Sequence, residues 1–313
     1  MTNTAPTLDL SAIPLGSFYI DGNWTKASSD KTIDVISPNT KTVIAQVADA
    51  NEDDIEAAVK AARRAFDDGA WSSLTFKQRA EWLRKLSAEI GKHLPELSLF
   101  WTEEIGVPYQ ASQGMTGFFS TALESYAEIG DTFEQVVEAP TQLPGKAYLA
   151  YEPVGVVAAI APWNVPLWTM LNKIGPALLT GCTVIMKPAP ETPLEAYVVA
   201  RCADAIGLPA GVLNLINAGR EGSDYLVRQS GVDKVSFTGS LATGRRIASV
   251  CAERIARCTL ELGGKSAAII LDDYDLEEAA NILVSSVLGL SGQNCGALTR
   301  ILVSEDRQED LLA

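Results

Sequence analysis

The stretch VGVVAAIAPWNVPLWTMLNKIGPALLTGCTVIMKPA, residues 154–189, decides the fold of this chain. A short run of small and β-branched apolar residues is followed by a helical pattern and then by a second apolar run. This order predicts a right-handed βαβ unit with two parallel strands. Because both runs are apolar throughout, we expect helices to cover both faces of the sheet.

The same alternation continues toward the C-terminus. Further strand-like runs lie at residues 212–217, 234–240, 258–264 and 265–271, and helical patterns lie at residues 192–207, 241–255 and 275–290. We therefore predict an α/β fold with a Rossmann-like parallel sheet and helices on both of its faces. Ligands of such sheets bind at the carboxyl ends of the strands, so the residues after each run are the candidates for a site.

The first third of the chain is mixed. Residues 17–28 and 31–50 alternate like short strands separated by turn residues. A helix is predicted to start after Asn51, which is a suitable N-cap. Residues 74–94 predict a second amphipathic helix, on which the single histidine, His93, is offset from the apolar stripe and is expected to be solvated.

Composition limits the class of protein. The 313 residues are 47% hydrophobic and 20% charged, as in globular proteins with a sizeable core, and the formal net charge of −14 argues against binding to nucleic acids and anionic membranes. The N-terminal residues lack the features of a signal peptide, and no apolar stretch approaches the roughly 18–20 residues of a membrane span. The five cysteines form neither a disulfide framework nor a metal-binding pair, so we expect no metal site and a cytoplasmic setting.

The common phosphate-binding motifs are absent from the sequence. There is no G-x-G-x-x-G, and GGKS at residues 263–266 is not a P-loop because Thr259 stands where the first glycine belongs. FTGS at residues 237–240 ends a strand and opens a helix, whose free N–H groups favour phosphate. Ser240 is therefore either a phosphate contact or a simple helix cap.

Three polar residues follow or end strands. Lys187 is either solvated or reaches the ribose or phosphate of a nucleotide. The amide of Asn164 either donates to an oxyanion or closes an Asx turn. Glu261 is either a surface carboxylate or a general base that is desolvated by its apolar neighbours.

Cys295 lies in a loop of Gly, Gln and Asn residues, unlike the other cysteines. A thiol is intrinsically nucleophilic even when only a few per cent of it is ionised. A carboxylate base, backbone amides or a helix end can activate it without histidine. The remaining cysteines lie among aliphatic residues and are expected in the core: Cys182, Cys202, Cys251 and Cys258.

Five short motifs occur in a fixed order. They are APWN (161–164), KPAPETP (187–193), FTGS (237–240), LELGGKS (260–266) and GQNC (292–295). In this order and at this spacing they resemble the aldehyde dehydrogenase superfamily, whose members oxidise aldehydes to acids with NAD or NADP. The resemblance extends from about residue 18 to the end of the sequence.

The resemblance implies a catalytic role for each matching residue. Cys295 would be the nucleophile that forms a thiohemiacetal and then a thioester, and Glu261 would be the general base that activates the hydrolytic water. Asn164 and the backbone N–H of Cys295 would form the oxyanion hole. Lys173 would take part in a proton relay.

The resemblance also implies a dinucleotide cofactor. Lys187 would contact the adenosine ribose and Ser240 the pyrophosphate, and the other implied cofactor-binding residues are Gly239, Pro162, Trp163 and Glu191. NAD-specific members often carry a glutamate three residues after the lysine, but here Pro190 holds that position and Glu191 follows it. We therefore expect NAD or NADP as the cofactor, with NAD preferred.

By the same resemblance, residues 1–262 form a dinucleotide-binding domain and residues 263–313 the first part of a catalytic domain. Family members continue well beyond the cysteine loop, so we expect a truncated chain that lacks the strand used in oligomer pairing. The hairpin that would pair with such a strand is expected at residues 134–153, and the family suggests a homo-oligomer. We expect an enzyme that oxidises a small-molecule aldehyde, or alternatively an impaired fragment that only binds a dinucleotide or a partner chain.

Overall fold

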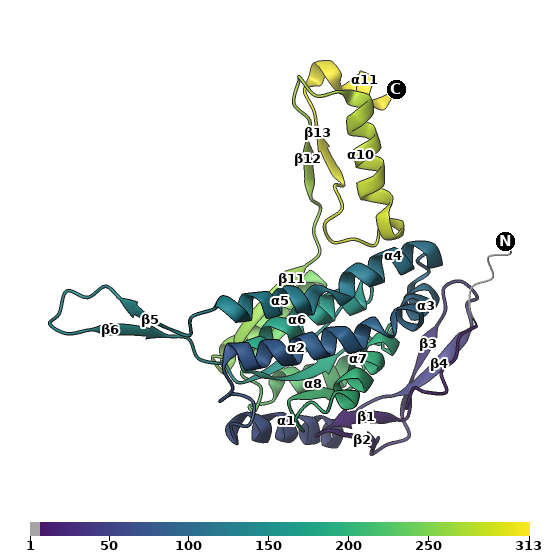
Figure 1. Ribbon diagram of the computed structural model, residues 1–313. Helices are drawn as coiled ribbons and strands as arrows, with labels where there is room; N and C mark the ends of the chain where they lie inside the picture. The colour runs from purple at the N-terminus through teal and green to yellow at the C-terminus, as the bar shows by residue number, and fades with distance from the viewer. Residues whose placement is uncertain (1–6) are drawn as a thin grey trace.

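The computed structural model describes residues 7–313. Residues 1–6, where the segment without signal-peptide features begins, lie outside the described residues. Figure 1 shows a main body, a hairpin that projects from it and a C-terminal unit that stands apart. Among residues 7–313, no helix combines the length and hydropathy needed to cross a bilayer.

A seven-stranded sheet forms the centre of the main body, in the order β11-β10-β7-β8-β9-β1-β2. Its parallel strands are β7 (Val156–Ile160), β8 (Thr183–Lys187), β9 (Leu213–Leu215), β10 (Lys234–Gly239) and β11 (Arg257–Leu262). The predicted parallel sheet is confirmed. β7 and β8 are buried at every position, as expected of apolar strands covered on both faces.

Helices cover the two faces of this sheet. One face carries α2 (Phe76–Gly91), α3 (Leu94–Ile105), α4 (Tyr109–Ser120), α5 (Ala122–Thr132), α6 (Pro166–Leu179) and α7 (Leu194–Ala205). The other carries α1 (Glu52–Asp67), α8 (Arg220–Arg228) and α9 (Leu241–Glu253). Successive strand residues serve opposite faces: Val184 and Met186 of β8 join the first cluster and Ile185 the second. The predicted Rossmann-like α/β class is confirmed.

The N-terminal third adds two hairpins. β1 (Ser17–Ile20) and β2 (Asn23–Lys26) are joined by Asp21 and Gly22, whose φ angles of 54° and 73° are those of a tight two-residue hairpin turn. β1 pairs antiparallel with β9 and so extends the central sheet. β3 (Thr32–Ile36) and β4 (Val43–Ala48) form a separate antiparallel pair.

The two helices predicted in this region are present, with one difference. Asn51 caps α1 as predicted, because its side chain accepts the N–H of Asp54 and the carboxylate of Asp54 accepts the N–H of Asn51. The second pattern is divided into α2 and α3. His93 lies at their junction, 3.2 Å from the carboxylate of Glu96, which also accepts a 2.7 Å hydrogen bond from Arg201. His93 is partly exposed, as expected, but it lies at the junction of two helices and not within one helix.

β5 (Val136–Ala139) and β6 (Ala147–Ala150) form an antiparallel hairpin within residues 134–153. It extends away from the main body (Figure 1). At its base the ring of Phe133 lies 4.5 Å from that of Phe76 and 5.2 Å from that of Tyr151, centroid to centroid. These aromatic contacts anchor the hairpin, and its part in oligomerisation stays a prediction.

The C-terminal unit follows β11. β12 (Ala267–Ile269) and β13 (Arg300–Leu302) pair in parallel beside α10 (Leu276–Leu288), and the remaining elements are the 3₁₀ turns η1 (Gly289–Gly292) and η2 (Glu305–Arg307) and the short helix α11 (Gln308–Leu312). Its buried cluster consists of Ile270, Ala279 and Leu283. The chain leaves the central sheet at residue 262. The domain boundary at this residue and the role of each part stay predictions.

Candidate functional site

The strand order places a topological switch point at the carboxyl edge of the sheet, the position at which doubly wound sheets form a ligand crevice. β7 lies between β8 and β10, and the chain after β7 enters α6 on one face, whereas the chain after β10 enters α9 on the other. The two connections diverge at this point, which is where doubly wound sheets bind nucleotides. Four of the predicted cofactor residues border it: Pro162 and Trp163 after β7, and Gly239 and Ser240 at the end of β10.

Lys187 ends β8 next to this crevice. Its side chain is 5% exposed, and burial lowers its pKa to about 8, against the opposing attraction of Glu191 and Asp49. A buried lysine ammonium is suited to donate hydrogen bonds to hydroxyl or phosphate oxygens of a ligand. Glu191, the other residue predicted in this segment, is exposed in the connection to α7.

Ser240 performs the capping role that the sequence left as an alternative. Its hydroxyl oxygen accepts the N–H of Thr243 at 3.2 Å, and its hydroxyl donates to Thr243 Oγ1 at 2.9 Å. Gly239 precedes it without room for a side chain, since a Cβ there would lie 2.5 Å from the ring of Phe237. α9 begins directly after the carboxyl end of β10, and the cap uses only the N–H of Thr243, so capping and anion binding by the other N–H groups of the first turn are compatible.

Asn164 connects the central sheet to the cysteine loop. Its side-chain amide donates to the carbonyl oxygen of Gln293 at 2.6 Å, and its own carbonyl oxygen accepts the indole N–H of Trp101 at 3.0 Å. The Asn164 side chain therefore closes no local Asx turn. An amide has two N–H donors, so one remains for a ligand.

Cys295 and Glu261 approach the same edge from different elements. Cys295 is exposed in the loop after η1, and a Cβ built on Gly264 would lie 4.0 Å from the Cys295 carbonyl oxygen. Gly264 follows closely on β11, which carries Glu261 near its end. The Glu261 side chain is exposed, so of the two alternatives for its surroundings the structure fits the surface carboxylate. The reason is that β11 is the edge strand and its α6-facing side is only partly covered.

Lys173 links α6 to the pair of strands β10 and β11. Its ammonium donates to Thr238 Oγ1 at 2.7 Å and to Ser236 Oγ at 3.4 Å. Burial lowers its pKa to about 8, and Glu261 on the neighbouring strand attracts the charged form. Thr238 and Glu261 are register partners in the β10–β11 pair, so Lys173 lies close to the predicted base.

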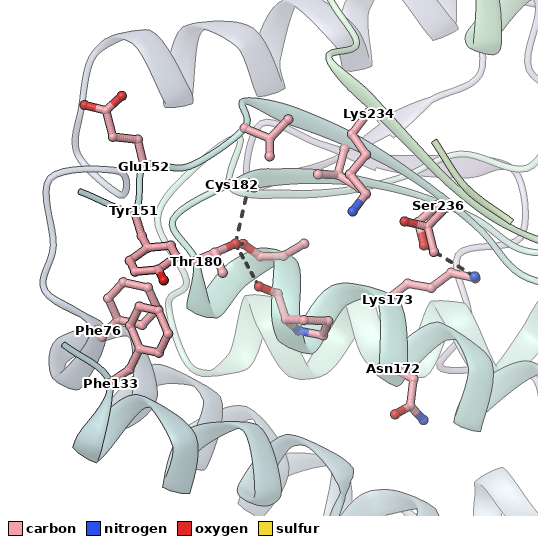
Figure 2. A pocket seen from close by; sticks show the side chains of 15 residues that line it. Phe76, Phe133, Tyr151, Glu152, Asn172, Lys173, Thr180, Cys182, Lys234 and Ser236 are labelled. Atoms are coloured by element: carbon pink, nitrogen blue, oxygen red, sulfur yellow. Dashed lines mark hydrogen bonds between the residues drawn. The ribbon is translucent and has the colours of Figure 1, made fainter. Parts of the chain in front are cut away.

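A cavity of about 330 Å³ continues from Lys173 toward the base of the hairpin. Figure 2 shows Lys173 reaching from α6 to Ser236, while Phe76, Phe133 and Tyr151 gather at the opposite end. The cavity lies near the amino ends of β7 and β10, as Lys234 in its lining indicates. It is therefore distinct from the crevice at the carboxyl edge.

The prediction for the remaining cysteines holds in three cases. Cys182, Cys202 and Cys251 are buried, whereas Cys258 is exposed on β11. The prediction for Cys258 was wrong because it rested on apolar sequence neighbours, and an edge strand leaves such a position open to solvent.

Sequence reasoning missed two buried carboxylates beneath the crevice. Glu195 accepts the N–H of Leu167 at 2.7 Å, and Glu104 accepts the N–H of Leu194 at 3.0 Å. Burial raises the pKa of Glu195 to about 8 and raises that of Glu104, which the nearby Glu195 raises further. They hold the first turns of α6 and α7. The one available signal was the acidic Glu195 within an apolar helical pattern.

Comparison with known proteins identifies relatives of this chain. The model of the aldehyde dehydrogenase family matches residues 24–313. Aminoacetaldehyde dehydrogenase of Pseudomonas aeruginosa is 40% identical over 313 residues, covering 98% of this chain and 62% of its own length. Geranial dehydrogenase of Castellaniella defragrans is 37% identical over 296 residues, covering 94% and 62% respectively.

Solved structures give the same result. Betaine aldehyde dehydrogenase of Staphylococcus aureus, in complex with NAD+, has a TM-score of 0.92 at 34% identity and covers 97% of this chain and 61% of its own. The NAD+ complex of aldehyde dehydrogenase from Bacillus cereus has a TM-score of 0.93 at 37% identity, covering 99% and 64%. The chain thus spans about three-fifths of the length of these relatives.

Proposed function

This chain belongs to the aldehyde dehydrogenase family, and we propose that it oxidises an aldehyde to a carboxylic acid with NAD or NADP. The observation that carries the proposal is the contact between Asn164 and the segment preceding Cys295. It joins a candidate oxyanion donor and a candidate nucleophile at the carboxyl edge of a dinucleotide-type sheet. A bound NAD or NADP would supply the hydride acceptor.

The proposed chemistry begins at Cys295. Glu261 accepts the thiol proton, and the sulfur adds to the carbonyl carbon of the aldehyde. The thiohemiacetal oxyanion that forms receives hydrogen bonds from the free amide N–H of Asn164 and the backbone N–H of Cys295. Donors of this kind typically contribute on the order of 10²–10³ in turnover. Oxidation at this carbon leaves a thioester on the sulfur.

Glu261 and Lys173 are proposed to manage the protons. The exposed carboxylate of Glu261 is accessible to water and can accept a proton from the water that hydrolyses the thioester. Lys173 lies near Glu261, is buried and has a pKa of about 8, so it can exchange a proton near neutral pH. Its hydrogen bond to Thr238 holds the amine in position.

The dinucleotide is proposed to lie in the crevice beside Lys187. The buried amine of Lys187 suits ribose hydroxyls, and the first turn of α9 after Ser240 suits the pyrophosphate. Glu191 follows Lys187 one position later than the corresponding glutamate follows the lysine in NAD-specific relatives. Its carboxylate would therefore repel the 2′-phosphate of NADP less strongly. We propose NAD as the preferred cofactor and NADP as an alternative.

A second candidate function is dinucleotide binding without aldehyde oxidation by these 313 residues. The observation that favours it is the exposure of both Cys295 and Glu261. Hydride transfer needs the reacting atoms held about 3–3.5 Å apart and shielded from water. Solvent-exposed groups on a loop and an edge strand meet this requirement less readily than groups in a closed pocket.

One experiment distinguishes aldehyde oxidation from dinucleotide binding alone. The purified chain is mixed with NAD or NADP and a panel of aldehydes, and formation of reduced nicotinamide is followed by absorbance. The dehydrogenase proposal expects turnover that Cys295→Ala abolishes and Cys258→Ala, at the other exposed cysteine, preserves. Thermal stabilisation by NAD without turnover supports the second candidate. Lys187→Gln should reduce that stabilisation in either case, and an unchanged shift would contradict the proposed cofactor site.

A further inference from the structure

The chain reversal between α9 and β11 brings two cysteines together. α9 ends at Glu253, and the N–H of Ala256 returns to the carbonyl oxygen of Cys251 at 2.9 Å. Ile255 forms the turn with a φ of 56°. β11 then runs back along α9, so residues late in the helix face residues early in the strand.

A second contact sets the register of this reversal. Near the start of α9, a Cβ on Gly244 would lie 2.5 Å from Leu262 Cδ2, so helix and strand touch there. Cys251 lies seven residues further along the helix, on the same face and about 10.5 Å away. Cys258 lies four residues back along the strand, on the same face as Leu262 and about 13 Å away. The two displacements agree to within about 3 Å, which places Cys251 close to Cys258.

Burial patterns agree with this register. Leu260 and Leu262 pack against the cluster that contains Cys251 and Val235. Cys258 has the same strand parity as these leucines, and its register partner in β10 is Val235. Burial raises the pKa of Cys251, and the adjacent Cys258 thiol raises it further. The register, the burial pattern and this influence agree that the two thiols are neighbours.

We propose that Cys251 and Cys258 are a thiol pair that forms a reversible disulfide between α9 and β11 when the protein meets a peroxide. The two residues differ in access, since Cys258 is exposed and Cys251 is 1% exposed. The exposed thiol reacts first, because oxidation requires contact with the oxidant. The buried thiol then resolves the product.

The steps balance. Hydrogen peroxide transfers one oxygen atom to the sulfur of Cys258, forming a sulfenic acid and one water. The sulfur of Cys251 attacks the sulfenic sulfur, the S–S bond forms, and the hydroxyl leaves as a second water with the Cys251 proton. Two thiols have lost two electrons and two protons, and one peroxide has become two waters. A dithiol reductant reverses the change by exchange.

The sequence allows a direct test by peptide mapping. Trypsin cleavage after Arg246, Arg254, Arg257 and Lys265 places Cys251 in residues 247–254 and Cys258 in residues 258–265, with residues 255–257 released between them. Cys182, Cys202 and Cys295 fall in three other peptides. The full chain carrying Cys295→Ser, which removes the other exposed thiol, is treated with hydrogen peroxide, alkylated at low pH, digested and analysed by mass spectrometry without reduction.

The expected result is a joined pair of peptides 247–254 and 258–265 with a mass about 2 Da below their sum, separated again by dithiothreitol. Cys258→Ser should leave peptide 247–254 fully alkylated. The cross-link should form faster in the folded chain than in concentrated urea. Equal rates of cross-link formation in the folded chain and in urea would overturn the proposal. The short separation of the two cysteines in sequence would then explain the cross-link without the fold. Oxidation of Cys258 to sulfinic acid without a cross-link would also overturn it.

Discussion

The side-chain amide of Asn164 donates a 2.6 Å hydrogen bond to the carbonyl oxygen of Gln293, 129 residues later in the sequence. This bond joins the carboxyl end of β7 to the loop that carries Cys295. The backbone of Asn164 is itself held by the indole N–H of Trp101. This side chain is therefore one of the contacts that position the cysteine loop against the central sheet, together with Leu290, which packs against the main core.

Replacing Asn164 should loosen that loop. Asn164→Ala removes a hydrogen bond whose net contribution is about 0.5–1.5 kcal/mol, so the loop should open more often. Amide hydrogen exchange across residues 289–297 should therefore be severalfold faster in this variant than in the parent. Asn164→Gln, which keeps the amide, is the matched control. An unchanged rate in the alanine variant would contradict the role assigned to the bond.

Lys173 should make stability rise with pH. Burial lowers its pKa from 10.5 to about 8, so between these values the unfolded chain holds a proton that the folded chain has lost, and stability increases as pH rises. Lys173→Met lacks this titration. Its free energy of unfolding relative to the parent should fall by roughly 1–2 kcal/mol between about pH 7.5 and about pH 9.5 in urea titrations. The exposed Lys26→Met should show no such change.

Glu195 should make stability fall as pH rises. Burial raises its pKa from 4.5 to about 8, so between these values the folded chain keeps a proton that the unfolded chain has released, and stability falls as pH rises. Glu195→Gln is permanently neutral and retains an acceptor for the N–H of Leu167. Its stability relative to the parent should increase by roughly 1–3 kcal/mol from about pH 5 to about pH 7.5. Glu128→Gln, at an exposed position on α5, is the control. Stability profiles of Glu195→Gln and the parent that run parallel with pH would refute the prediction.

Arg79 should be the costliest of these residues to remove. It is 1% exposed and donates to the carbonyl oxygens of Leu179, Ser72 and Leu74, the first of which ends α6. Arg79→Met leaves these carbonyls without the donor, which should lower the free energy of unfolding by about 2–4 kcal/mol in a denaturant titration. Arg64→Met removes a half-exposed ion pair and should cost less than about 1 kcal/mol. Similar losses in both variants would contradict the structural role of Arg79.

The amino-acid sequence by itself determined the local elements and their type. The apolar runs of β7 and β8 and the helical pattern between them predict a parallel sheet because hydrophobic periodicity is a local property. The cap at Asn51 and the tight turn at Asp21 and Gly22 are local in the same way, since each depends on residues a few positions apart. The five motifs identified the family for the same reason.

Only the tertiary structure decided which distant segments meet and which side chains are open to solvent. It joins β1 to β9 and places Cys251 close to Cys258. It leaves Cys258 exposed although its apolar neighbours in sequence suggested burial, and it leaves Glu261 exposed where the sequence allowed either state. Exposure of a strand residue depends on whether another strand or helix covers it, and β11 lies at the edge of the sheet. Pairing and edge position arise from the packing of the whole chain, which periodicity within one segment does not encode.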